Sequence, residues 1–293
     1  MRVIVLGATG MLGSMVYGYL RNSTGLEVTG TSRNKEAGFL GLDVNEDYPA
    51  MQKKMKNCDY IINCIGITKP YCHDDNMEEV RNALLVNSLF PFKLSDLAKQ
   101  NNTRVIQIAT DCVYSGREGK YTEDALHDPL DVYGKTKSLG EVKSPHYLNI
   151  RSSIIGPEKV KKAFLFEWFM KQPKGAFLNG FSNHLWNGVT TLQFAKLCER
   201  IIKDNKFSYL AGISSVHHFV PNNIVSKYQM LCMFKDVFKR EVVIKEERAG
   251  DGVVDRTLAT KYNGISSFFP GSDLESEIYE LKKYIEDTGF YNA

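Results

Sequence analysis

The sequence predicts an α/β fold in which a doubly wound, parallel β-sheet is joined to a smaller C-terminal α/β cap. Through the first half of the chain, short β-branched runs alternate with amphipathic helical patterns, as in sheets whose strands are connected by helices. A glycine-rich turn follows the first of these runs directly. The chain has 293 residues, of which 43% are hydrophobic and 24% charged, so one large domain or two coupled domains are expected.

Four strands and three helices are expected in the first half. The predicted strands are Arg2 to Leu6, Leu26 to Thr31, Asp59 to Ile65 and Arg104 to Ala109. The predicted helices, in which apolar residues recur at spacings of three and four, are Met11 to Leu20, Glu78 to Val86 and Phe90 to Gln100. Ligands of such sheets bind at the carboxyl ends of the strands. We therefore expect the residues just after Leu6, Thr31, Cys64 and Ala109 to converge on one crevice.

The second half has a looser pattern. Helices are expected near Leu192 to Ile202, Asn223 to Phe238 and Leu274 to Asp287, after an aromatic-rich stretch from Phe164 to Met170. We assign residues 1–155 and about 185–222 to the sheet domain, and about 156–184 and 223–293 to the cap, with the chain crossing between them more than once.

Composition and charge exclude several classes of function. The net charge is only +3 and no basic run exceeds two residues, so no nucleic-acid partner is expected. No apolar stretch is long enough for a signal peptide or a membrane span. The six cysteines have no paired spacing, so we expect free thiols in a cytoplasmic protein. Cys64, Cys72 and His73 lack a second ligand pair, and no metal is assigned.

The glycine-rich turn is the first candidate binding element. Its three glycines, Gly7, Gly10 and Gly13, follow a predicted strand and open a predicted helix. Glycines permit a tight turn and close approach to a phosphate, while the amides of a helix N-terminus donate to it. The turn therefore predicts a dinucleotide site of the Rossmann type. The residues assigned to the pyrophosphate are Gly7, Thr9, Gly10, Met11, Leu12 and Gly13.

The end of the second predicted strand indicates which nicotinamide cofactor binds. There the chain has Ser32 and Arg33, a hydroxyl and a guanidinium that suit the extra phosphate of NADPH. Glu27 lies at the wrong end of the strand to bind ribose hydroxyls. We expect NADPH, with NADH as the alternative. The other interpretation is that Arg33 is a solvated charge in a surface loop with no role in binding.

A hydroxyl, a phenol and an ammonium are candidates for proton transfer. Tyr133 and Lys137 are four residues apart, on one face if their segment is helical, and Thr110 ends a predicted strand. Tyr279 and Lys283 have the same spacing but lie far from any predicted strand end. We expect Thr110 to hold a carbonyl oxygen, Tyr133 to donate the proton, and Lys137 to lower the phenol pKa and bind the cofactor ribose.

Taken together, these residues resemble the extended short-chain dehydrogenases/reductases, and most closely the dTDP-4-dehydrorhamnose reductase-like family. The resemblance covers most of the chain and is most specific from Ala109 to Glu141. It implies NADPH-dependent reduction of the 4-keto group of a nucleoside-diphosphate 4-keto-6-deoxysugar, in the synthesis of deoxysugars for surface polysaccharides. The sheet domain would then bind NAD(P), the cap would bind substrate, and Thr110, Tyr133 and Lys137 would be catalytic.

The resemblance also implies further site residues. Those assigned to the cofactor are Asp43, Val44, Cys64, Ile65, Gly66, Asn87 and Lys137, with Asn87 supporting the lysine. Those assigned to the substrate are Asp111, Cys112, Tyr133, Asn183, Trp186 and Arg256. No other partner follows from the sequence, and the protein is expected to be a monomer or a homodimer.

Three alternatives remain open. Cys112 occupies a position where GDP-L-fucose synthases have a proton-shuttling cysteine, which would suit a coupled epimerase-reductase. Its partner histidine is not identifiable; His184 is the nearest candidate, and a small buried thiol is the plainer interpretation. A sugar-nucleotide epimerase with bound NAD is the second alternative. The third is a non-catalytic NADP-binding regulatory subunit, because the β subunit of methionine adenosyltransferase resembles this family.

Overall fold

The computed structural model describes residues 1–34, 38–250 and 252–292, and its largest element is a seven-stranded sheet in which every pairing is parallel. The strand order is β3-β2-β1-β4-β5-β6-β11. The strands are β1 (Arg2–Leu6), β2 (Glu27–Ser32), β3 (Leu40–Gly41), β4 (Tyr60–Asn63), β5 (Arg104–Ala109), β6 (Tyr147–Arg151) and β11 (Val216–His218). The order reverses between β1 and β4, which creates a crevice at their carboxyl ends. The predicted α/β class is confirmed.

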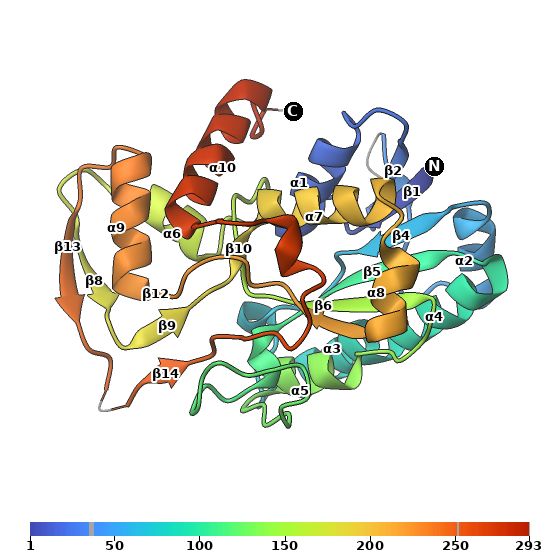
Figure 1. Ribbon diagram of the computed structural model, residues 1–293, viewed down its shortest axis with the longest axis horizontal. Helices are drawn as coiled ribbons and strands as arrows, with labels where there is room; N and C mark the ends of the chain where they lie inside the picture. Colours follow the sequence, from blue (N-terminus) through green and yellow to red (C-terminus); the bar gives the residue numbers. More distant parts are fainter. Residues whose placement is uncertain (35–37, 251, 293) are drawn as a thin grey trace.

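Helices cover both faces of this sheet (Figure 1). One face packs on α1 (Met11–Leu20), α7 (Thr191–Lys203) and α8 (Phe207–Ile213), and the other on α2 (Tyr48–Met55) and α4 (Phe90–Asn101). Successive side chains of a strand point to opposite faces, so Val3 and Val5 of β1 enter the first core while Ile4 and Leu6 enter the second.

One long helical stretch runs from Met77 to Asn101, where the sequence predicted two separate helices. It comprises α3 (Met77–Ala83), a π-helical turn (Leu84–Leu89) and α4. Pro91 has no amide to donate to the carbonyl of Asn87, so the regular α-helical ladder is interrupted there. The amide of Phe90 instead donates to the carbonyl of Leu85, five residues back. The π turn carries Asn87 toward the sheet edge where the candidate site lies.

The cap has its own sheets and its own core. It contains α6 (Leu165–Met170), α9 (Lys227–Val237), a parallel pair and a three-stranded sheet. The pair is β8 (Phe177–Phe181) with β13 (Val243–Glu247), and the three-stranded sheet is β12 (Val225–Ser226), β9 (His184–Trp186) and β14 (Val254–Asp255). Aromatic rings from α6 and α9 fill the cap core, including Phe166, Phe169 and Phe234.

The remaining elements join the sheet domain to the cap. They are η1 (Lys69–Tyr71), η3 (Asp111–Val113), α5 (Val132–Leu139), β7 (Ile154–Ile155), β10 (Val189–Thr190), η4 (Ser266–Phe268) and α10 (Leu274–Thr288). Figure 1 shows α10 between the two parts. Leu274 and Ile278 of α10 belong to the cap core, while Leu281 belongs to the first core of the sheet domain. Helix α10 therefore packs on both parts, and β9 pairs with β12 and β14, while the predicted division into two domains stays a prediction.

None of the helices in the described ranges is long and apolar enough to cross a membrane. All six cysteines are free of disulfides. Within the same ranges, no three His, Cys, Asp or Glu side chains are grouped so as to hold a metal ion.

Candidate active site

A cavity of about 1040 Å³ lies between the carboxyl edge of the sheet and the cap. The β1–α1 turn, the ends of β4 and β5, and the start of α5 line its sheet side, while Trp186 and Lys227 line its cap side. Site residues predicted from the sequence that line it are Thr9, Gly10, Met11, Leu12, Arg33, Cys64, Ile65, Gly66, Thr110, Asp111, Cys112, Tyr133, Lys137 and Trp186. The convergence of strand ends expected from the sequence is confirmed.

The β1–α1 turn is built to accept an anion. Gly7 has a φ of +73°, and a Cβ added to Gly13 would lie 2.0 Å from the Gly7 carbonyl oxygen, so both positions require glycine. Neither glycine lines the cavity; they shape the turn that does. Helix α1 begins after Gly10 with no side-chain cap and no acidic residue in its first turn. Its first amides therefore suit a phosphate group, which fits a dinucleotide pyrophosphate.

The residues predicted to choose between the cofactors have different positions. Arg33 is exposed and lines the cavity, whereas Ser32 is buried at the end of β2 and does not line it. Asp43 and Val44 also lie outside the lining. The Asp43 carboxylate accepts hydrogen bonds from the backbone and side-chain amides of Asn45, both at 2.8 Å, and Val44 packs against the second core. The adenine contacts expected at residues 43 and 44 stay a prediction.

Thr110, Tyr133 and Lys137 meet in the cavity. Thr110 follows β5, and its hydroxyl oxygen accepts a hydrogen bond from the amide of Cys112 at 3.2 Å. Tyr133 and Lys137 lie on α5, and the Tyr133 phenol is close enough to Thr110 for that side chain to lower the phenol pKa slightly against the effect of burial. A Cβ added to Gly134 would lie 2.2 Å from the Cys112 carbonyl oxygen, so this glycine lets α5 approach η3 closely enough for the phenol to reach Thr110.

Burial sets the proton affinities of the phenol and the ammonium. It raises the pKa of Tyr133 well above its ordinary value, so the phenol keeps its proton at neutral pH. It lowers the pKa of Lys137 to about 8, against the opposing effects of Glu141 and Cys64. The Lys137 ammonium donates to the carbonyl of Ile108 at 2.9 Å. Burial has the largest effect on the pKa of Tyr133, and the expected lowering of that pKa by Lys137 stays a prediction.

Asn87 organises the site without contacting the lysine directly. Its side-chain oxygen accepts from the amide of Ile67, and its side-chain nitrogen donates to the Ile67 carbonyl, both at 2.9 Å. The same nitrogen donates to the Thr136 hydroxyl at 3.1 Å. Asn87 thus joins the segment after β4 to helix α5, beside Lys137 rather than against it.

The residues assigned to the substrate divide into two groups. Asp111, Cys112 and Trp186 line the cavity, but Asn183 and Arg256 do not. The Asn183 side chain donates to the Ala249 carbonyl and accepts from the Ala249 amide, both at 3.0 Å, so it holds the loop after β13. Arg256 donates to the Tyr114 carbonyl at 3.1 Å. The Asn183 amide is held by the protein's own backbone, and one of the five donors of the Arg256 guanidinium is.

The cysteine that opened the epimerase alternative is a weak acid here. Burial and the Asp111 charge raise the pKa of Cys112 to about 12, so its thiol stays protonated at neutral pH. His184 does not line the cavity, and its ring packs 5.1 Å from that of Phe181. A thiol that stays protonated favours the interpretation of Cys112 as a pocket-lining residue.

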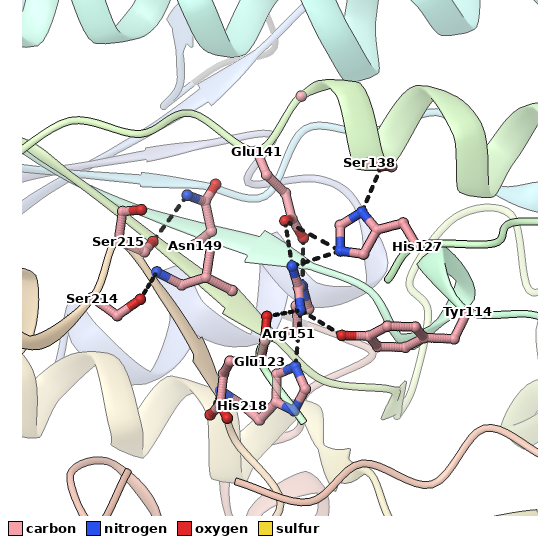
Figure 2. Close-up of polar contacts among 12 residues, drawn as sticks. Tyr114, Glu123, His127, Ser138, Glu141, Asn149, Arg151, Ser214, Ser215 and His218 are labelled. Atoms are coloured by element: carbon pink, nitrogen blue, oxygen red, sulfur yellow. Dashed lines mark hydrogen bonds and ion pairs between the residues drawn. The ribbon is translucent and has the colours of Figure 1, made fainter. Parts of the chain in front are cut away.

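Behind α5, a buried polar network centres on Arg151 (Figure 2). Its guanidinium forms a two-point ion pair with Glu141 at 2.7 Å for each nitrogen–oxygen contact. It also donates to the Tyr114 hydroxyl at 2.6 Å, to Nε2 of His127 at 2.7 Å and to Nε2 of His218 at 3.1 Å. These partners tie the ends of β6 and β11 to the segment after η3 and to the residues just after α5, the helix that carries Tyr133 and Lys137.

The network fixes both histidines in the neutral form. A guanidinium can only donate, so Nε2 of His127 and of His218 must accept, and the proton of each ring is on Nδ1. Nδ1 of His218 then donates to the Ala259 carbonyl at 2.7 Å. Burial and the Arg151 charge lower the pKa of His127, and burial lowers that of His218 to about 4.

Lys227 is a cavity residue that the sequence interpretation missed. It is the first residue of α9, directly after β12. A cation in the first turn of a helix opposes the helix dipole, and this unfavourable position was the available signal.

A family model described as the RmlD substrate binding domain matches residues 1–249. Among relatives, the methionine adenosyltransferase 2 subunit beta of Danio rerio is 26% identical over 269 residues, covering 86% of this chain and 79% of that protein. A dTDP-4-dehydrorhamnose reductase of Aggregatibacter actinomycetemcomitans is 25% identical over 260 residues, covering 83% of this chain and 81% of that protein.

Solved structures share the fold. A dTDP-4-dehydrorhamnose reductase from Clostridium acetobutylicum has a TM-score of 0.76 at 21% identity, covering 98% of this chain and 100% of that one. A Bacillus anthracis dTDP-4-dehydrorhamnose reductase, solved in complex with NADP, has a TM-score of 0.73 at 17% identity, covering 97% and 98% of the two chains.

Proposed function

Because the chain belongs to the RmlD substrate binding domain family, we propose that it uses NADPH to reduce the 4-keto group of a nucleoside-diphosphate 4-keto-6-deoxysugar. The observation that carries this proposal is the meeting of Thr110 and Tyr133 in the cavity that also contains the uncapped start of α1. Two hydroxyl groups beside a phosphate-binding turn suit the reduction of a carbonyl group. The dTDP-4-dehydrorhamnose reductase relative supports the choice of sugar.

The sheet side of the cavity fits the cofactor. The first amides of α1 would hold the pyrophosphate, and Arg33 would pair with the additional phosphate of NADPH. Lys137 lies deeper in the cavity, where it would bind the nicotinamide ribose. NADPH bound there supplies the hydride.

Thr110 and Tyr133 would act on the carbonyl oxygen. Thr110 donates a hydrogen bond that stabilises the negative charge developing on that oxygen. The carbonyl π bond breaks as its carbon gains the hydride, and the oxygen takes the proton of the Tyr133 phenol. Water then returns a proton to the phenolate. Because burial raises the pKa of Tyr133, the phenol enters each cycle protonated.

Lys137 would stabilise the site after proton transfer. Lys137 lies one helical turn along α5 from Tyr133, and its pKa of about 8 leaves most of its ammonium charged at neutral pH. A nearby cation lowers the free energy of the phenolate that Tyr133 becomes. The hydrogen bond to the Ile108 carbonyl orients this ammonium.

A substrate panel tests the proposal. The protein is incubated with NADPH and a set of nucleoside-diphosphate 4-keto-6-deoxysugars, and loss of nicotinamide absorbance is followed. We expect one sugar to be reduced with one NADPH consumed per molecule of product. NADPH that binds but is oxidised by no sugar of the panel would contradict the proposal.

That contrary outcome would favour a second candidate function. The similarity to methionine adenosyltransferase 2 subunit beta over most of the chain supports an NADP-binding regulatory subunit. Such a subunit would bind NADPH with no turnover, so the same assay separates the two candidates.

A further inference from the structure

The cap side of the cavity has a charged group that the proposed chemistry does not use. Lys227 of α9 reaches the cavity from the cap, and Asp111 reaches it from the sheet domain. The Lys227 ammonium lies 5.8 Å from the centroid of the Trp186 ring. We call Lys227, Trp186 and Asp111 the cap-side site.

Lys227 has the longest contact of the cavity lysines, because its ammonium lies 5.8 Å from the nearest ring centroid. Lys69 pairs with Asp131 at 2.6 Å, Lys137 donates to a carbonyl, and Lys161 lies 3.7 Å from the Tyr71 ring centroid. Lys159 is likewise engaged, with its ammonium 4.8 Å from a ring centroid. Lys227 makes no hydrogen bond and no ion pair with any residue in the described ranges.

Holding Lys227 there is unfavourable for the fold alone. Burial lowers its pKa, which means that the surroundings oppose its charge, and the dipole of α9 opposes it too. Asp111 favours the charge, but Asp111 also interacts with Arg256. A methionine could pack against Trp186 without these costs.

The cap-side site lies close to a second cation, Arg256. Lys227 and Arg256 are two cations facing one carboxylate, Asp111. Both cations lower the pKa of His184, as expected of a positive potential at this end of the cavity. Arg256 donates to the Tyr114 carbonyl and does not line the cavity, so Lys227 is the cation that a ligand can reach.

We propose that Lys227 binds a phosphate of the substrate's diphosphate group. This inference rests on the proposed function and identifies the residue that selects a phosphate-linked sugar over a free one. Asp111 is adjacent in the chain to Thr110, so an anion at Lys227 lies close to the carbonyl held by Thr110 and Tyr133. A sugar spans that gap, with its keto group at Tyr133 and its anomeric phosphate at Lys227. Asp111 can accept a hydrogen bond from a sugar hydroxyl.

The test uses the full chain saturated with NADP⁺, so that no turnover occurs. Binding of thymidine diphosphate, uridine diphosphate and uncharged thymidine is measured by titration calorimetry. The variants are Lys227→Met, which removes the charge, Lys227→Arg, which keeps it, and the control Lys235→Met, on the same helix but outside the cavity lining.

We expect Lys227→Met to weaken binding of the better diphosphate about tenfold or more, as loss of a charge-assisted hydrogen bond implies. Lys227→Arg should retain most of the affinity, Lys235→Met all of it, and thymidine and NADP⁺ should bind every variant equally. Lys227→Gln replaces the methionine variant if the latter does not fold.

Three results would overturn the inference: unchanged diphosphate affinity in Lys227→Met, an equal loss of NADP⁺ affinity, or no diphosphate binding by the original chain. Failure of the proposed function gives a different result. In that case diphosphate binding depends on Lys227 although no keto sugar oxidises NADPH. Lys227 could instead bind the carboxylate of a sugar acid. A uronic acid would then bind in a Lys227-dependent manner while the diphosphates would not bind, and this result would also overturn the proposal.

Discussion

Arg151 and Glu141 form a two-point ion pair that is almost entirely buried, with both nitrogen–oxygen distances at 2.7 Å. The pair lies just beyond the end of the helix that carries Tyr133 and Lys137. Removing one partner of such a pair leaves the other charge buried and uncompensated, which is far more costly than losing an exposed ion pair.

Glu141→Gln is therefore expected to lower the free energy of unfolding by about 3 kcal/mol. Urea denaturation measures the change. The matched control is Glu241→Gln, whose exposed ion pair with Lys174 should contribute less than about 1 kcal/mol. Equal effects of the two substitutions would show that the buried pair does not stabilise the fold.

The protein should lose stability as the pH falls from about 6.5 toward about 4. Burial lowers the pKa of His218 to about 4 in the folded state, whereas an unfolded histidine titrates near 6.5. Between these two pH values the unfolded state binds more protons than the folded state. The free energy of unfolding therefore decreases as the pH decreases. Thermal unfolding across this range should show a weaker pH dependence for His218→Gln than for the original protein. The same slope in both proteins would refute this assignment.

Gly134→Ala should impair turnover much more than cofactor binding. Its added Cβ would lie 2.2 Å from the Cys112 carbonyl oxygen, so α5 must move away from η3 and separate Tyr133 from Thr110. We expect kcat to fall at least tenfold, because small displacements of reacting groups are costly. Gly212→Ala, in α8 with nothing within 4 Å of the added Cβ, is the control and should leave kcat unchanged. A variant at position 134 with normal kcat would show that this close approach is unnecessary.

Arg33→Ala should weaken NADPH binding about tenfold or more and NADH binding little, because only NADPH has the phosphate that pairs with a guanidinium. Fluorescence titration with each cofactor measures both affinities. Arg248→Ala, at an exposed arginine outside the cavity lining, should change neither. Equal losses for NADPH and NADH at position 33 would reject the phosphate contact.

Local patterns predicted much of the sheet domain. Arg2–Leu6, Met11–Leu20 and Arg104–Ala109 have the predicted bounds, because their periodicity and the flanking glycine turn are local signals. The catalytic candidates were also predictable, since strand ends of a parallel sheet converge on one edge.

What the sequence could not predict depends on contacts between distant segments. The side-chain amide of Asn183 is hydrogen-bonded to the backbone of Ala249, 66 residues away in the chain, and Asn183 does not line the cavity. The cap brings Lys227 into the cavity that Asp111 lines, a juxtaposition that no local pattern indicates. The pKa of Tyr133 depends mainly on burial, which the spacing of Tyr133 and Lys137 does not indicate.

The central claim is that the Tyr133 phenol delivers a proton to the carbonyl oxygen of a nucleotide-linked keto sugar. Single-turnover reduction by Tyr133→Phe, with NADPH and substrate both saturating, tests it most directly. We expect the rate of NADPH oxidation to fall about 10²-fold or more while NADPH affinity is retained, because the substitution removes proton donation and leaves the cofactor contacts in place. An unchanged rate in Tyr133→Phe would contradict the account.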